Sequence, residues 1–223
     1  MYPSHRTEDY EDWPHPGGGE PPCWGRMYIT LVIAGEYMAK GDTFFIRGQV
    51  VAPTASSQNR AEGEIDLGSY VNLGVNKGTA LRVHSVQVQF CDDKGLVPLI
   101  DASAGTGGQT RGTYACAAIT TAQVPSSFAA DEMPQINEDY VMFSAAISGV
   151  NPNNDNDQGI LTHDTDIAPQ HLKNGYLLAV ESLYLYGAGD DAWNEDVYIN
   201  FMLECSLETI TQATAVSLSL SQS

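Results

Sequence analysis

Oxygen-bearing side chains gather between residues 151 and 164. Asn153, Asp155 and Asp157 stand at alternate positions, and Asp164 follows eleven residues after Asn153. Carboxylate and amide oxygens at such spacing can converge on Ca²⁺. A helix–loop–helix calcium motif would have Gly at position 158 and Glu at position 164, where this chain has Gln and Asp. The pattern therefore leaves two interpretations open, a calcium site at these four residues or a plain Asn/Asp-rich loop.

Histidines offer a second set of candidate ligands and bases. Four potential metal ligands lie close together in the sequence: His163, Asp164, Asp166 and His171. Their order, H-D-T-D-x4-H, matches no metal-site spacing that we can support, so we expect a solvated polar loop. His84 lies beside Arg82 in a strand-like segment, where a packed or surface role is more common than catalysis.

Other catalytic signatures are missing from the sequence. There is no G-x-S-x-G nucleophile elbow, and the four cysteines, at 23, 91, 116 and 205, form no C-x-x-C pair. A cupin-type enzyme would need a second histidine close to His84. The Gly-rich stretch at 105–108 is not followed by the Gly-Lys-Ser/Thr of a phosphate loop. We therefore predict a protein that is not an enzyme and has no cofactor apart from the calcium alternative.

Acidic side chains dominate the ionisable groups. The 223 residues include 28 Asp and Glu against 10 Lys and Arg, which gives a net charge of −18. Because phosphate binding depends on Lys and Arg, direct contact with nucleic acid is disfavoured, as is adsorption to an anionic membrane. High salt screens the self-repulsion of such a surface, so a halophilic, acidic protein is predicted. No apolar stretch approaches the roughly 18 residues of a membrane-spanning helix, so we expect no membrane insertion.

Four aromatic residues near the C-terminal third of the chain could form a platform on which a sugar stacks: Tyr184, Tyr186, Trp193 and Tyr198. The same residue types are common in β-sheet cores and at protein interfaces, and we favour that interpretation. Tyr184 and Tyr186 are accordingly predicted as interface residues.

Strand-like segments make up the body of the chain. Segments rich in β-branched and aromatic residues lie at 43–51, 80–90, 113–124, 139–148, 176–186 and 197–211. In the last one, apolar residues alternate with polar ones from Val197 to Leu207, a period that a helix does not produce. In 80–90 the apolar face changes near Ser85, which predicts a β-bulge. Loops of unequal length, with one or two helical turns at 168–174, predict an all-β sandwich or jelly roll of about eight strands.

The two ends of the chain differ from this body. Residues 1–26 contain five prolines, three consecutive glycines and few aliphatic side chains, which is typical of an extended N-terminal arm. Trp13 and Trp24 would be costly to leave in water, so we predict that they anchor the arm on the same or a neighbouring subunit. Residues 27–211 form the jelly-roll domain. Residues 212–223 form a C-terminal tail whose alternation predicts an added strand on a neighbour.

This arrangement resembles the single jelly-roll capsid proteins of icosahedral, tailless viruses. The shared features are the arm, about eight strands, long polar insertions and a C-terminal strand pair that carries tyrosines, over roughly residues 27–211. Low lysine, high aspartate and the lack of a signal-peptide pattern also resemble virion proteins of archaeal or marine hosts. The arm departs from the resemblance, because it has Glu8, Asp9, Glu11 and Asp12 where many such proteins have basic residues that touch the genome.

The resemblance implies a viral structural protein that assembles from many copies of itself, with a second capsid protein as a further partner and the virion as its location. The acidic arm implies that something else neutralises the genome, or that a membrane or inner layer intervenes. The alternative is an extracellular β-sandwich module that binds carbohydrate or is braced by calcium.

Overall fold

The computed structural model describes residues 42–54, 60–74, 77–100, 111–125, 127–129, 132–151 and 160–222, all within the compact unit Met38–Ser223. The predicted arm with Trp13 and Trp24 lies outside the described residues, as do Asn153, Asp155 and Asp157. Within the described part, no helix is long and apolar enough to cross a membrane.

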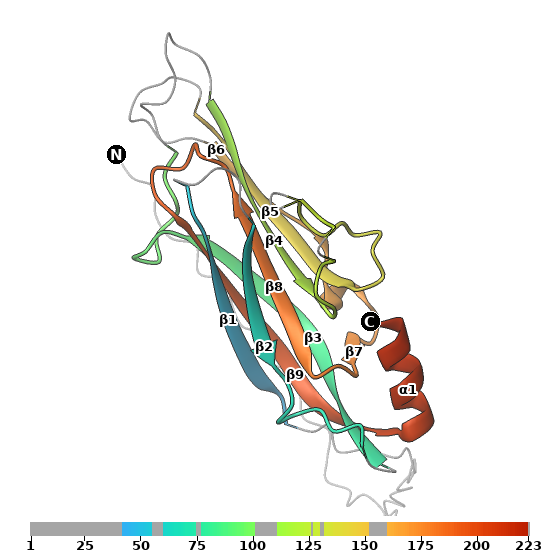
Figure 1. Ribbon diagram of the computed structural model, residues 1–223. Helices are drawn as coiled ribbons and strands as arrows, with labels where there is room; N and C mark the ends of the chain where they lie inside the picture. Colours follow the sequence, from blue (N-terminus) through green and yellow to red (C-terminus); the bar gives the residue numbers. More distant parts are fainter. Residues whose placement is uncertain are drawn as a thin grey trace, which may run out of the picture. The chain divides into compact units, whose positions relative to one another are not determined.

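Nine strands in the described part of the chain form two antiparallel sheets (Figure 1). The four-stranded sheet has the order β1 (Phe44–Ala52), β9 (Val197–Thr211), β3 (Lys77–Cys91) and β7 (Tyr176–Leu178). The five-stranded sheet has the order β2 (Ala61–Asp66), β8 (Ser182–Gly189), β4 (Arg111–Thr120), β5 (Val141–Asn151) and β6 (Ile160–Ile167).

The order of the strands defines the fold. The first strand pairs with the last, β2 pairs with β8, and β3 pairs with β7. Successive pairs alternate between the two sheets, so the chain wraps around the sandwich as nested pairs. This wrapping of two packed antiparallel sheets is the jelly roll, and the predicted all-β jelly-roll sandwich is confirmed.

The core lies between the two sheets. The residues of β9 that face it are at most 2% exposed, as the predicted alternation requires: Val197, Ile199, Phe201, Leu203 and Cys205. Phe201 meets Phe143 of β5 edge to face, with ring centroids 6.3 Å apart, and so joins the two sheets. Leu207, at the end of the predicted face, is 47% exposed.

Strand β3 contains the predicted bulge. Its pairing with β9 shifts between Val83 and Ser85, which leaves His84 as the extra residue. Gly175 closes against this bulge with a φ of +67°, and a Cβ there would lie 2.3 Å from the carbonyl oxygen of Val83. Both the backbone conformation and the lack of space therefore require glycine.

The sequence predicts one strand over 176–186, and the structure corrects this to two strands in different sheets. β7 ends at Leu178 and β8 begins at Ser182. Between them, the N–H of Ala179 donates to Oε1 of Gln222 at 3.0 Å, and the carbonyl of Glu181 accepts from the N–H of Leu67 at 2.7 Å. The segment 176–186 contains no Gly or Pro that would predict this break. The turn is stabilised by residues that are distant in the sequence, so the local pattern does not show it.

The C-terminal segment is a helix, which corrects the predicted added strand. α1 (Gln212–Ser221) begins after Thr211, whose hydroxyl caps the N–H of Thr214 at 3.3 Å. Ala215 is buried against Ala80 and Ile210. The Ser/Leu alternation suits either structure, and the cap together with this small apolar contact favours the helix.

Candidate functional site

The predicted ligands do not come together where the structure describes them. Asp164 is exposed on β6, and its Oδ1 accepts from the N–H of Thr165 at 2.9 Å. The calcium site stays a prediction, because its other three residues lie outside the described part. The expected polar loop around His163 is wrong, since His163, Asp164 and Asp166 belong to β6. Successive strand residues point to opposite faces, and the His163 ring instead lies 5.7 Å from that of Phe90.

One group of three acids could converge on a cation among the described residues: Asp92, Asp93 and Glu195. Asp92 is 6% exposed. Its Oδ1 accepts from the N–H groups of Lys94 and Leu96 at 2.9 and 2.7 Å, so it stabilises the turn that follows β3. These hydrogen bonds account for the burial of Asp92, and we assign the group no ligand.

Two of the four aromatic residues that could have formed a sugar platform are buried, so the four do not form one together. Trp193 is 2% exposed and donates its Nε1–H to the carbonyl of Tyr114 at 2.9 Å. Tyr186 is 1% exposed, and its hydroxyl accepts from the N–H of Val124 at 3.0 Å. A ring this buried cannot face a partner, so Tyr186 is not an interface residue of this subunit. Tyr184 is partly exposed and stays a candidate.

The outer face of the five-stranded sheet is covered around Tyr186. The loop between β4 and β5 lies over it, and a small second core contains Ala118, Val124, Tyr186 and the partly buried Phe128, Met133 and Tyr140. Arg60 lies over the Tyr186 ring, 5.1 Å from its centroid, and pairs with Glu62 at 2.8 Å. Burial raises the pKa of the Tyr186 phenol. This face is therefore structural.

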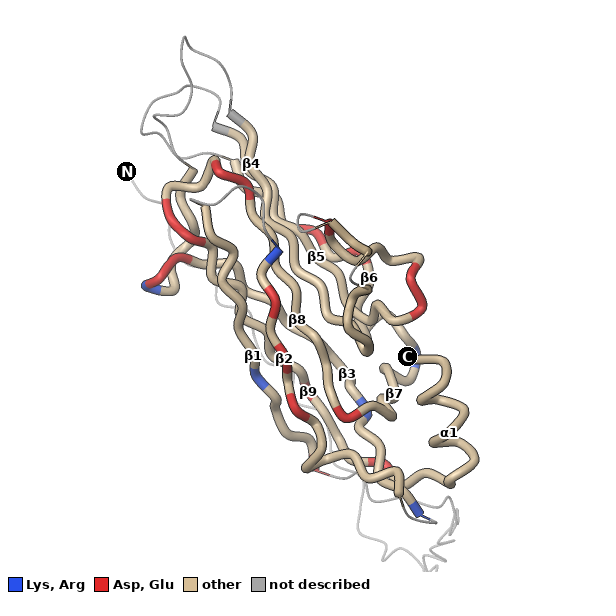
Figure 2. The backbone as a smooth tube through the Cα atoms, viewed as in Figure 1, with Lys and Arg blue, Asp and Glu red and all other residues tan. Residues whose placement is uncertain are grey.

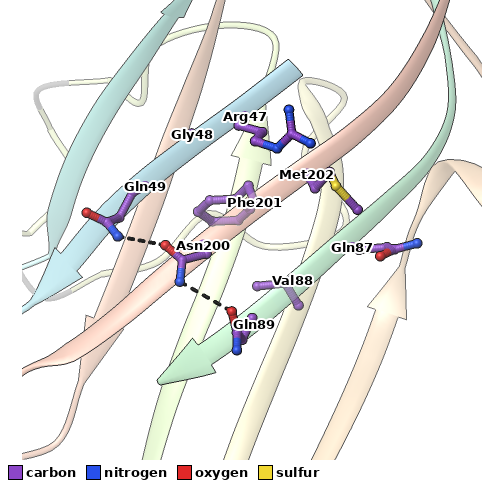
Figure 3. A pocket seen from close by; sticks show the side chains of 9 residues that line it. All are labelled: Arg47, Gly48, Gln49, Gln87, Val88, Gln89, Asn200, Phe201 and Met202. Carbon is purple, nitrogen blue, oxygen red and sulfur yellow. Dashed lines mark hydrogen bonds between the residues drawn. The ribbon is translucent and has the colours of Figure 1, made fainter. Parts of the chain in front are cut away.

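The outer face of the four-stranded sheet is open instead. A shallow hollow of about 760 Å³ lies across β1, β9 and β3 (Figure 3). Its lining includes Arg47 and Gln49 of β1, Gln87 and Gln89 of β3, and Asn200 and Met202 of β9, and none of the described residues that line it is acidic. The alternation from Val197 to Leu207 predicts a polar face that includes Asn200, but it does not predict that this face meets β1 and β3.

A row of amide groups crosses this hollow. Nε2 of Gln49 donates to Oδ1 of Asn200 at 2.7 Å, and Nδ2 of Asn200 donates to Oε1 of Gln89 at 3.5 Å (Figure 3). Nδ2 of Asn200 also donates to Sγ of Cys91 at 3.2 Å, so both of its N–H groups have partners. The amides of Gln49 and Gln89 have more donors and acceptors than these bonds use. The hollow can therefore offer uncharged hydrogen bonds to a partner, next to Arg47, the one cation among its described lining residues.

Toward α1 the same face has charged and polar side chains, and these bond to one another. Arg82 of β3 bonds Glu208 of β9 at 2.5 Å and the carbonyl of Asn174 at 2.7 Å. Nε2 of His84 and the hydroxyl of Ser206 lie 2.7 Å apart. Ser206 is 8% exposed, and no hydrogen bond from the His84 ring to a carboxylate is found in the described residues. The pair lacks the orienting acid of a catalytic triad.

The described thiols are also poor nucleophiles. Cys91, Cys116 and Cys205 are free thiols. Burial raises the pKa of all three, and it raises the pKa of Cys205 to about 12. Because the thiolate is the reactive form, none of them is activated. Among the described residues, neither these thiols nor the pair of His84 and Ser206 has the environment of an activated nucleophile.

Comparison with known proteins finds likeness in structure alone. No protein-family model matches the chain, and no curated protein matches its sequence. Among solved structures, VP1 of human polyomavirus 12 in complex with 3'-sialyllactosamine has a TM-score of 0.41 and 9% identity, over 76% of this chain and 100% of that chain. VP1 of trichodysplasia spinulosa-associated polyomavirus, in complex with sialylated glycooligomers, has a TM-score of 0.38 and 10% identity, over 76% and 95%.

An unassembled VP1 pentamer of Washington University polyomavirus has a TM-score of 0.37 and 11% identity, over 75% of this chain and 95% of that chain. All three TM-scores lie below 0.5. The class of the protein, a jelly-roll β-sandwich, therefore rests on the strand order of the chain itself.

Proposed function

We propose that the protein is a structural (capsid) subunit of a viral shell that is built from many copies of this chain. The observation that carries the proposal is a jelly-roll body with one sheet face whose hollow has no acidic side chain among the described residues that line it. Jelly rolls occur in viral capsids, lectin domains and cupins, and a fold alone does not choose among them. The described histidines His84, His163 and His171 lie on three different elements, which does not support a cupin-type metal site.

The charge of the chain supports contact through this face. Copies that each have a net charge of −18 repel one another, most strongly at low ionic strength. The hollow is lined by amides, apolar groups and Arg47, so a contact there adds little repulsion. Assembly is expected to weaken as salt is removed and to recover with salt or divalent cations.

The remaining parts of the proposal follow the sequence. The shell includes a second capsid protein as a partner, the subunit does not contact the genome directly, and the host lives in a saline habitat. Trp13 and Trp24 anchor the arm on the same or a neighbouring subunit. Deletion of residues 1–22 should leave a folded domain that assembles poorly, and undiminished assembly of that variant would contradict the role of the arm.

Electron microscopy and light scattering of the purified full chain, from low to molar salt, test the proposed function. We expect particles at high salt, and a strict monomer under every ionic condition would contradict the proposal. Gln87→Glu adds a charge to the exposed rim of the hollow and should raise the salt needed for assembly. Gln135→Glu is the matched control, because it adds the same charge to an exposed position in the loop between β4 and β5.

The amide row favours a second candidate function, a module that binds carbohydrate. Amide groups can hydrogen-bond sugar hydroxyls, and Gln49, Asn200 and Gln89 present three of them side by side. This candidate predicts glycan binding that is lost in Asn200→Ala. A glycan array without hits for the full chain would remove it.

A further inference from the structure

Among the described strands, three of the four sheet edges are protected against pairing with another chain. β7 is only three residues long. Asp164 and Asp166 of β6 are exposed, as are Glu62, Glu64 and Asp66 of β2. The acidic positions along β2 are red in Figure 2. Short edge strands and charged side chains are the usual means by which sheet edges avoid adding foreign strands.

The edge at β1 lacks this protection. It is nine residues long, its one charged side chain is Arg47, and it contains no proline. Phe45 is 49% exposed. On the side away from β9, β1 pairs with no other described strand. Because antiparallel pairing uses only part of the backbone groups of an edge strand, the rest of the N–H and C=O groups of β1 face outward.

The neighbouring edge limits what can pair with β1. β2 runs close beside it, since a Cβ on Gly63 would lie 3.6 Å from the carbonyl oxygen of Gln49. If the β1 edges of two jelly-roll domains paired with each other, the acids of β2 in one copy would therefore lie against the same acids of the other copy. A single extended segment adds a strand to β1 without that repulsion.

The chain itself contains a segment of the required chemistry. Residues 28–34 have the sequence YITLVIA, which is uncharged, rich in β-branched and aromatic residues, and free of Gly and Pro. Nine residues, 35–43, separate this segment from β1, whereas hairpin connections usually have about two to five. This length favours pairing with another copy over a hairpin with the following strand.

We infer that the edge of β1 binds residues 28–34 of a second copy of this chain, which extend its sheet by one strand. Main-chain hydrogen bonds would provide the affinity, and the alternating side chains the specificity. The inference rests on the proposed function, because it gives the self-assembling subunit a defined contact.

Amide hydrogen exchange of the full chain, followed by mass spectrometry on peptides that cover Phe44–Ala52, tests the inference. We expect about half of these amides to be slowed as the protein concentration rises, because strand addition bonds the outward N–H groups. Leu31→Asp places a charge in the segment and should abolish the concentration-dependent slowing. Leu96→Asp is the matched control, because Leu96 is a 63% exposed leucine in the β3–β4 loop, and it should leave the slowing intact.

Light scattering on the same samples separates this inference from the proposed function. Particles whose β1 amides exchange freely would overturn the inference and leave the capsid proposal standing. Slowing that does not depend on concentration would also overturn it, because the segment would then pair within its own chain. Slowing that depends on concentration, in small oligomers that never grow, would support the inference and contradict the capsid proposal.

Discussion

The two sheets of the sandwich share one core but differ on their outer faces. On the five-stranded sheet, Tyr186 projects outward and is then covered by the loop between β4 and β5, with Arg60 over its ring. On the four-stranded sheet, α1 covers Ala80 and Ile210 at one end, and the hollow around Asn200 stays open. The covered face contributes to the stability of the subunit, and the open face is available to a partner.

The largest expected effect is the loss of the covered aromatic ring. Tyr186→Ala should lower the free energy of unfolding by about 3–5 kcal/mol, because it removes a buried aromatic side chain and leaves a cavity. Tyr198→Ala, a partly exposed tyrosine on the open face, is the matched control and should cost much less. Denaturant unfolding measures both, and equal costs would show that the two faces do not differ in this way.

Replacement of Gln222, the residue that follows α1, should have the next largest effect on stability. Oε1 of Gln222 accepts from the N–H of Ala179, its Nε2 donates to the carbonyl of Leu177 at 2.7 Å, and its carbonyl accepts from the Thr121 hydroxyl at 2.8 Å. Gln222→Ala removes the partner of the buried N–H of Ala179 and of the partly buried carbonyl of Leu177, so we expect a loss of about 1–3 kcal/mol in the free energy of unfolding. Gln170→Ala is no suitable control because it bonds the backbone of Val86. Gln135→Ala, exposed in its loop, is suitable and should be neutral.

The burial of the inner face of β9 can be tested through the pH dependence of stability, because the thiol of Cys205 lies on that face. The outer face of the same strand is open to solvent. The pKa of Cys205 is raised to about 12 by burial, from an ordinary value of 9.0. Between these values the unfolded chain releases the thiol proton and the folded chain keeps it, so stability falls as pH rises from about 9 to 12. The expected slope from this thiol is at most about 1.4 kcal/mol per pH unit. Unfolding measurements should show a shallower slope in Cys205→Ala, and an unchanged slope would contradict the assignment.

The smallest effect on stability is expected in the hollow. Asn200→Ala breaks the amide row on an open surface, where water can replace the lost hydrogen bonds. The free energy of unfolding should therefore change by less than about 1 kcal/mol. Thermal unfolding measures this change. A loss as large as that of Tyr186→Ala would mean that the amide row maintains the fold and is not a surface for partners.

Much of the fold could be predicted from periodicity. The alternation in 197–211 and the phase change at Ser85 correspond to β9 and to the bulge in β3. β2 and β6 escaped prediction, because the acids that protect them as edge strands are rare in strands generally. For the candidate site, the sequence predicts the polar face of β9. It does not predict that this face lies beside β1 and β3, because the three strands are far apart along the chain.

The sequence by itself determined the class of the protein, because period-two patterning and turn residues act locally and leave few alternatives to a β-sandwich. Tertiary structure decided which surfaces are accessible. Tyr184 and Tyr186 stand two residues apart on one strand, yet Tyr186 is buried and Tyr184 is partly exposed. The difference comes from a loop some 60 residues away, which supplies the N–H of Val124 to the Tyr186 hydroxyl. Burial depends on such distant contacts, and no local pattern encodes them.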